Sequence, residues 1–95
     1  MNQYGSQALR YWKEYLPERY AQIEDPTEFF TNLGAEMAQQ VDELSWAIAG
    51  QDPPGESYLE KVGRLNHARL AAEEEVMREM LPASEQEDET DATAA

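Results

Sequence analysis

The sequence predicts an all-α protein. We expect a long antiparallel helical hairpin with an N-terminal helical arm, together a three-helix bundle, followed by a disordered acidic C-terminal tail. Three observations favour this fold: separate helix start signals at Asp25 and Ser57, a connector rich in proline and glycine between the two helices, and apolar residues recurring every three or four positions. The domain organisation that follows is a helical bundle domain over residues 1–81 and a disordered acidic tail over residues 82–95.

The N-terminal arm is predicted as a kinked pair of short helices. Ser6 can cap the first one. Pro17 predicts its end near Leu16, because the residue before a proline avoids the helical conformation. Pro17 also suits the first turn of a second short helix, so we assign residues 6–24 to the arm.

Aromatic side chains are concentrated in this arm, and two interpretations of them stay open. The rings can cover the hydrophobic core, or Tyr11, Trp12 and Tyr15 can form a partner-binding face, since tyrosine and tryptophan dominate the anchors of protein interfaces. The aromatic residues among the first twenty positions are Tyr4, Tyr11, Trp12, Tyr15 and Tyr20.

The first long helix is predicted to begin after Asp25. That side chain can cap, Pro26 suits the first helical position, and Glu28 stands where a capping box places its acid. The helix should run to Ala49, where Gly50 is a natural left-handed terminator. The seven-residue repeat of its apolar stripe includes Gly34, which would allow a close helix contact. The stripe consists of Phe30, Met37, Val41, Leu44 and Ile48.

The second long helix is predicted between a capping box at Ser57 and Glu60 and the proline at position 82. Arg69 falls on its apolar stripe, so its charge needs a partner. The stripe consists of Tyr58, Val62, Leu65, Ala72 and Val76.

The partner of Arg69 is predicted from the connector QDPPGE, which reads as a tight loop that makes the two long helices antiparallel. Folding about the loop centre places Arg69 opposite residues 36–40. We therefore predict a buried polar network of Glu36, Asn66 and Arg69 that sets the helix register. A partner contact or a small anion-binding spot stays open as the alternative for this cluster.

Arg64 and His67 lie on another face of the same helix than Asn66 and Arg69, because residues three apart share a face. The four side chains therefore cannot form one site on one helix. Arg64 and His67 are either ordinary surface or partner-binding residues.

The charge balance is strongly acidic: 7 basic residues against 20 acidic ones, a net charge of −13. Such a field repels DNA, RNA and anionic membranes and attracts a basic protein surface, although acidity can also serve only to keep a small protein soluble. There is no cysteine, no apolar run long enough to cross a bilayer and no leader pattern. We therefore expect a soluble, cytoplasmic protein without direct contact to nucleic acid or membrane.

Catalytic chemistry is not indicated. His67 is the only histidine, so one chain cannot assemble a histidine metal site, and Arg64 stands where a Glu-x-x-His motif would need its glutamate. The acidic run at residues 73–75 points around a helix and is typical of a solvated surface. No glycine-rich phosphate loop is present. We expect no enzyme activity, no metal and no cofactor.

Two segments carry a resemblance to a known family. The run from Arg10 to Pro17, RYWKEYLP, is followed by a long acidic helix and then by VGRLNxxR at residues 62–69, with an acidic run that ends in Val76. Over roughly residues 9–81 the chain resembles the small transposon-encoded proteins called TnpV. The resemblance implies an accessory protein of a bacterial mobile element or phage.

Three functional hypotheses follow. The favoured one is a non-enzymatic accessory protein that acts by binding a protein partner. The alternative is an acidic, nucleic-acid-mimicking inhibitor of a host nucleic-acid-binding or defence protein, whose basic surface it would occupy. The third is self-association into a homodimer, because a hairpin alone cannot cover both apolar stripes.

Overall fold

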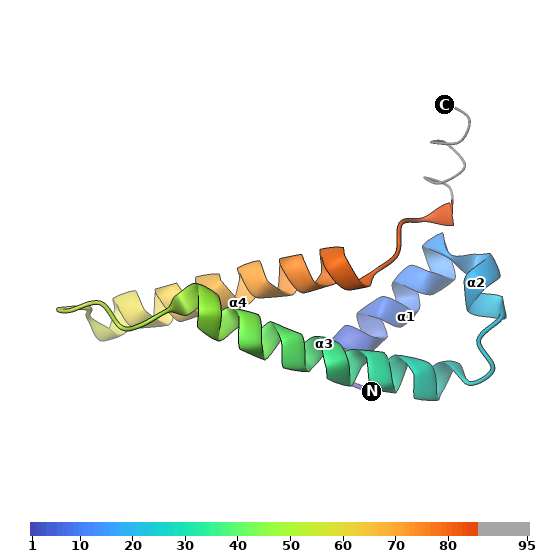
Figure 1. The fold of residues 1–95 in the computed structure, drawn as a ribbon, viewed down its shortest axis with the longest axis horizontal. Helices are drawn as coiled ribbons and strands as arrows, with labels where there is room; N and C mark the ends of the chain where they lie inside the picture. The colour runs from blue at the N-terminus through green and yellow to red at the C-terminus, as the bar shows by residue number, and fades with distance from the viewer. Residues whose placement is uncertain (86–95) are drawn as a thin grey trace, which may run out of the picture. The chain divides into compact units, whose positions relative to one another are not determined.

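The computed structural model describes residues 1–85, and this part of the chain contains four helices and no strand (Figure 1). The all-α prediction is therefore confirmed. The predicted arm corresponds to two helices and each predicted long helix to one. The helices are α1 (Gln3–Tyr15), α2 (Pro17–Ala21), α3 (Pro26–Ala49) and α4 (Tyr58–Met80).

The described chain divides into two compact units. One consists of residues 1–36 and 81–85 and is called the aromatic unit below; the other consists of residues 37–80 and is called the hairpin. Helix α3 contributes its first half to the aromatic unit and its second half to the hairpin. The packing of the arm across the hairpin into one three-helix bundle stays a prediction.

The first helix begins earlier than predicted, because Asn2 and not Ser6 is its cap. The Asn2 side-chain oxygen accepts a hydrogen bond from the Gly5 amide at 2.9 Å, and its amide nitrogen donates to the Gly34 carbonyl, also at 2.9 Å. Ser6 lies inside α1. One asparagine thus caps α1 and ties it to α3, which a serine at position 6 could not do.

Two buried glycines allow α1 to approach α3 closely. A Cβ atom on Gly34 would lie 2.7 Å from the Gly5 nitrogen and 2.8 Å from the Gly5 Cα, distances that real Cβ atoms do not show. The prediction that Gly34 permits a close helix contact is confirmed. The partner is α1, and the Asn2 hydrogen bonds lie beside the contact.

The core of the aromatic unit consists of stacked and edge-on rings. Trp12 is buried and contacts the rings of Phe29 and Phe30 at centroid distances of 5.4 and 5.7 Å. Tyr20 stacks on Phe30 at 6.2 Å, and Leu16, directly before the break between α1 and α2, is fully buried. The aromatic residues of the arm therefore build a core around the start of α3.

Residues 82–85 belong to the aromatic unit, which corrects the prediction that a disordered tail begins at residue 82. The Tyr11 hydroxyl donates a hydrogen bond of 2.7 Å to the Pro82 carbonyl, and Ser84 is buried. The Glu85 carboxylate accepts a hydrogen bond of 3.1 Å from the Arg19 amide at the start of α2. Free amides at a helix N-terminus favour such an anion. The rest of the predicted tail lies outside the described residues.

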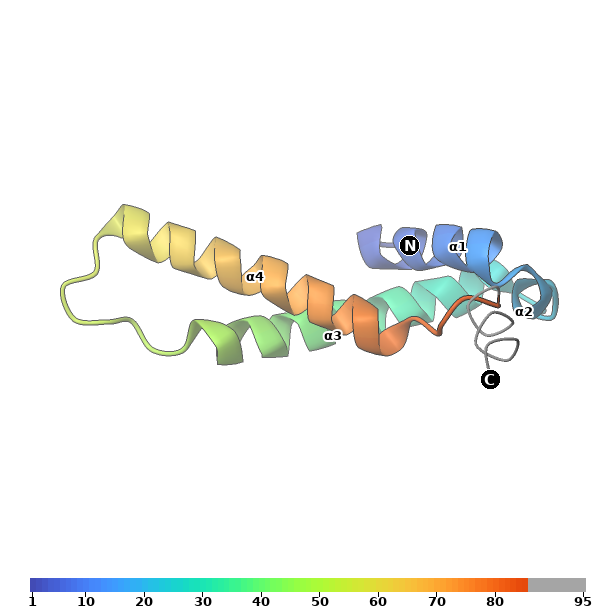
Figure 2. The ribbon, with the colours of Figure 1, turned by 90° about the horizontal axis from the view of Figure 1, so that it is seen from above.

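The start and stop signals of the two long helices are confirmed. The Asp25 side chain accepts from the Glu28 amide at 3.1 Å, and the Ser57 hydroxyl accepts from the Glu60 amide at 3.1 Å. Gly50 ends α3 with a φ angle of +65°, the left-handed conformation that glycine adopts without strain. In both views, α4 runs back beside the second half of α3 from the connecting loop (Figure 2).

The buried face of α4 agrees with the predicted stripe at Ala72 and Val76. It departs from the stripe at Ala68, which is buried, and at Tyr58, which is 80% exposed. Alanine allows two helices to approach closely, so the face with the smallest side chains turns inward. Among the described residues no helix is long and apolar enough to span a bilayer. The buried hydrophobic side chains of the hairpin are Met37, Val41, Ala49, Ala68, Ala72 and Val76.

Candidate protein-interaction surface

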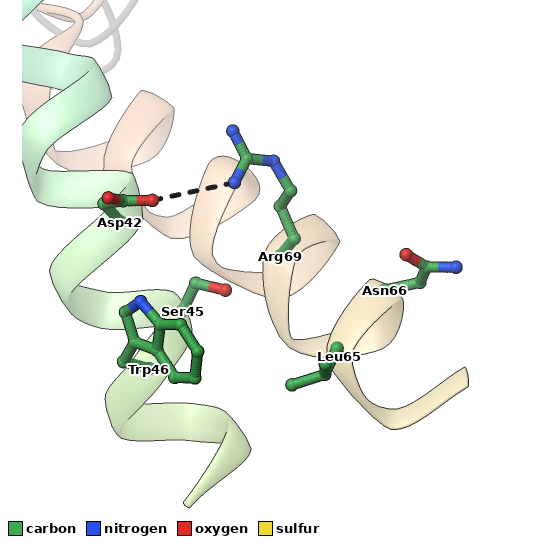
Figure 3. A pocket seen from close by; sticks show the side chains of 6 residues that line it. All are labelled: Asp42, Ser45, Trp46, Leu65, Asn66 and Arg69. Atoms are coloured by element: carbon green, nitrogen blue, oxygen red, sulfur yellow. Dashed lines mark ion pairs between the residues drawn. The ribbon is translucent and has the colours of Figure 1, made fainter. Parts of the chain in front are cut away.

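A groove between α3 and α4 of the hairpin is lined by an exposed tryptophan and by two oppositely charged side chains (Figure 3). Its volume is about 200 Å³. Three residues come from α3 and three from α4, so the groove exists only when the hairpin is closed. The lining residues are Asp42, Ser45, Trp46, Leu65, Asn66 and Arg69.

Trp46 forms one wall of this groove and Leu65 the other, with Ser45 between them in Figure 3. Trp46 is 67% exposed, whereas a large aromatic side chain in a monomeric protein is usually mostly buried. It is one of several large apolar side chains that the hairpin exposes. They are Trp46, Ile48, Tyr58, Leu59 and Leu70.

An ion pair crosses the groove. An Arg69 guanidinium nitrogen lies 3.8 Å from an Asp42 carboxylate oxygen, with the two side chains 50% and 68% exposed. At this length and exposure the pair contributes under about 1 kcal/mol to folding. The predicted buried network is wrong: Glu36 and Asn66 are exposed, and Arg69 is ion-paired with Asp42, which follows the predicted partner Glu36 by six residues.

The register of the hairpin explains this correction. Asp42 lies opposite Arg69, and Trp46, one turn later on α3, lies across the groove from Leu65, one turn earlier on α4. Because the buried face of α4 is centred on Ala72, Arg69 is rotated by about 60° from that centre to the edge of the interface. Its aliphatic stem lines the groove, and its charge stays in contact with solvent.

Arg64 forms hydrogen bonds to the loop that connects α3 and α4. Its guanidinium donates to the Glu56 carboxylate at 2.7 and 3.1 Å, to Asp52 at 2.6 Å, and to the carbonyl of Ala49 at the end of α3. Lys61 adds an ion pair of 2.7 Å to Asp52. Arg64 therefore stabilises the connection between the two helices, a role that the sequence pattern did not indicate.

The same contacts shift two acid–base equilibria. The hydrogen bond from Lys61, followed by its charge and by Arg64, lowers the pKa of the Asp52 carboxyl below its usual value of 3.8. The Glu56 carboxylate, with Asp52, raises the pKa of the Arg64 guanidinium. Each shift favours the charged form, so the loop keeps its ion pairs over the whole neutral range.

The remaining predicted partner-binding residues differ in their exposure to solvent. Trp12 lies in the core of the aromatic unit, as the first interpretation of the arm expected, and cannot serve as a docking side chain without unfolding it. Tyr11 is half-buried with its hydroxyl bonded to Pro82. Tyr15, 43% exposed, and the exposed His67 are available to a partner.

Residues 1–85 contain no group of three or more histidine, aspartate and glutamate side chains that could hold a metal ion. Trp46, the most informative residue of the groove, was not singled out from the sequence. At 100° per residue it lies about 180° around the first long helix from Met37 of the apolar stripe, so a tryptophan on the polar face was the signal available in the sequence. No family model, curated protein or solved structure matches this chain.

Proposed function

We propose that this chain is a small, acidic, non-enzymatic accessory protein of a bacterial mobile element or phage, acting in the cytoplasm by binding a protein partner. The groove around Trp46 is the docking site of this proposal. The observation that carries it is a tryptophan two-thirds exposed in a hollow between two helices. Tryptophan side chains seated in such hollows are the typical energetic centres of protein interfaces.

The gain from covering this tryptophan is large enough to matter. Full burial of an aromatic side chain removes roughly 150–250 Å² from water, and each Å² of apolar surface contributes about 25 cal/mol. Covering the exposed part of Trp46 would therefore contribute roughly 3 kcal/mol, which corresponds to about a hundredfold in affinity. The surrounding Ser45 and Asn66 provide a polar rim.

The biological context of the proposal comes from the resemblance to TnpV proteins. The RYWKEYLP segment supplies Tyr11, Trp12 and Leu16 to the aromatic unit, and the VGRLNxxR segment supplies Arg64, which clamps the loop, and Arg69 of the groove. Both segments of the resemblance thus hold structural positions. The resemblance supports a mobile-element context, and the exposed groove supports the binding role.

The test is affinity capture from a bacterial lysate with the full chain as bait, at low and at high salt. We expect a protein that stays bound at high salt, because apolar contacts are not screened. Trp46→Glu should abolish this capture. The matched control is Tyr58→Glu, which places the same charge at an exposed aromatic position outside the groove. Equal capture by both variants and the unchanged chain would refute docking at Trp46.

A second candidate function is inhibition of a basic, nucleic-acid-binding protein. Every basic residue of the hairpin is engaged with a carboxylate: Lys61 with Asp52, Arg64 with Asp52 and Glu56, Arg69 with Asp42, and Arg78 with Glu74 and Glu75. The excess charge that the hairpin presents to a partner is therefore acidic.

An open hollow in the hairpin supports this candidate, because two carboxylates in its lining would attract a cationic side chain. Its lining residues are Gln40, Glu43, Leu44, Val76 and Glu79. An inhibitor of this kind would bind fast at low salt and weakly at high salt, because steering by charge is screened. Capture that occurs only at low salt and is insensitive to Trp46→Glu favours this function over the first.

A further inference from the structure

The rim of the Trp46 groove carries one charge of each sign, placed symmetrically. Asp42 on α3 and Arg69 on α4 lie at the same height along the hairpin, since they form an ion pair of 3.8 Å. One turn away, Trp46 on α3 lies across the groove from Leu65 on α4. Helix α3 thus offers a carboxylate and an aromatic ring where α4 offers a guanidinium and an aliphatic side chain (Figure 3).

We propose that a second copy of this chain occupies the groove, in a two-fold arrangement whose axis runs parallel to α3 and α4. The inference rests on the proposed docking role of the groove and names its occupant. Rotation about such an axis leaves the position of every residue along the helix direction unchanged. It sets α3 of one copy against α4 of the other. It places Asp42 of each copy opposite Arg69 of the other, and Trp46 of each copy on Leu65 of the other. A self-complementary patch is what a two-fold interface requires.

The helix directions fit this arrangement. Helices α3 and α4 are antiparallel within one hairpin, so the axis sets α3 of one copy antiparallel on α4 of the other. Two hairpins then form a four-helix bundle in which neighbouring helices are antiparallel, a common stable packing. Asn66, which lines the groove, lies about 20° from Leu59 and about 40° from Leu70 around α4, so these two leucines lie at the outer edge of the proposed interface. Leu59 and Leu70 are 78% and 67% exposed.

Charge favours a second copy over a cationic occupant at this groove. Arg69 stands on the rim and would repel a lysine or arginine inserted beside Trp46, whereas the pair of Asp42 and Arg69 makes the rim locally neutral. Because both side chains are at least half exposed, either can exchange its contact within the chain for one across the interface.

The small core of the hairpin gives a reason for association. Three of its six buried hydrophobic side chains are alanines, whereas five large apolar side chains are exposed. Two packed hairpins would cover Trp46 and Leu65 of both copies. Glu43 and Glu79, which flank a different hollow, are not needed for this contact. A dimer therefore keeps acidic surface for a further partner.

The test is sedimentation equilibrium of the full chain and of two charge variants, Asp42→Arg and Arg69→Asp. In the proposed dimer, Asp42→Arg alone sets two guanidinium groups against each other at each contact, and Arg69→Asp alone sets two carboxylates. Each variant by itself should weaken the dimer by about tenfold or more. An equal mixture of the two should associate as a heterodimer with nearly the affinity of the unchanged chain.

The mixture separates contacts between chains from contacts within one. Neither variant can form the ion pair between positions 42 and 69 inside its own chain, alone or mixed, so only a contact across the interface explains recovery. Trp46→Glu should also give a monomer. Glu79→Arg, which makes the same charge change as Asp42→Arg outside the groove, should leave the dimer intact. Circular dichroism of each variant checks that its helices are retained, as the exposure of all four positions predicts.

Each outcome decides the proposal. A monomeric unchanged chain at the highest soluble concentration overturns it, and so does a dimer that is indifferent to Trp46→Glu or shows no recovery in the mixture. If the chain is a monomer and Trp46→Glu still abolishes capture of another protein, the second copy is excluded while the proposed docking role stands. If the mixture recovers the dimer but no other protein is captured at any salt, the inference stands and the proposed accessory role fails.

Discussion

The aromatic unit and the hairpin are stabilised in different ways, although helix α3 runs through both. The aromatic unit buries Tyr4, Trp12, Leu16 and Phe30 and closes its helices on a pair of glycines. The hairpin buries mostly small side chains and relies on a loop of ion pairs around Arg64. The first unit exposes Tyr15 and Phe29 by 43% and 39%, whereas the second leaves Trp46 67% exposed.

This contrast assigns separate roles to the two parts of the chain. In the aromatic unit the large rings contact one another, and the cations Arg19 and Lys13 lie over Trp12 and Tyr20 at 5.2 and 5.7 Å. Those rings are structural. In the hairpin Trp46 lies on the surface of a groove and contributes little to the fold. Binding is therefore expected from the hairpin, and folding stability from the aromatic unit.

The two tryptophans test this contrast most strongly. Trp12→Ala should lower the free energy of unfolding by about 3–5 kcal/mol, because it removes a ring packed between Phe29 and Phe30 and leaves a cavity. Trp46→Ala should change it by under about 1 kcal/mol in protein dilute enough to be monomeric, where no contact between copies adds to stability. Urea unfolding followed by circular dichroism measures both. Similar losses at the two positions would contradict the division of roles.

A pair of glycines provides the next largest effect. Gly34→Ala should destabilise the chain by about 1–3 kcal/mol, because the added methyl group meets the Gly5 backbone, which cannot yield as a flexible side chain would. Gly63→Ala in α4 is the control, since a Cβ there meets no atom within 4 Å. It should stabilise the helix by roughly 0.5–1 kcal/mol. Opposite signs of the two melting-temperature shifts are the expected result.

Substitutions of two arginines test the loop and the groove of the hairpin separately. Arg64→Met removes the contacts to Glu56, Asp52 and the end of α3, and should lower the melting temperature by several degrees. Arg69→Met removes one long, exposed ion pair and should leave the melting temperature of the dilute, monomeric protein almost unchanged. Thermal melts of both variants measure this. Equal destabilisation would mean that Arg69 is structural after all.

The smallest expected effect is a dependence of the loop on acid. Because the pKa of Asp52 is lowered in the folded protein, its contribution is fully present above the usual value of 3.8 and is lost as the pH falls through the folded pKa. Unfolding at successive pH values should therefore show a small loss below about pH 4, which Asp52→Asn reduces. A variant whose acid profile matches that of the unchanged chain would exclude Asp52 from the loop contacts.

The limits of α3 and α4 could be predicted from the sequence because each depends on neighbours within one turn. Asp25 and Ser57 cap amides three residues away, and Gly50 adopts the left-handed conformation at the end of α3. The break at Pro17 is local in the same sense. The all-helical class follows from these signals, since each one marks where a helix begins or ends.

Contacts between distant residues could not be predicted in this way. Asn2 caps α1 because Gly34, thirty-two positions away, offers its carbonyl, and Glu85 lies at the start of α2 because the chain returns there. The inward face of α4 depends on how closely two helices approach: Ala68 turns inward beside Ala72 and Val76 of the predicted stripe, while Tyr58 of that stripe is exposed. Periodicity places a side chain on a helix, but packing against the partner helix selects the face that is buried. The position of Trp46 opposite the apolar stripe of α3 follows from the sequence, whereas its place beside a groove and the pairing of Arg69 with Asp42 emerged only from the tertiary structure.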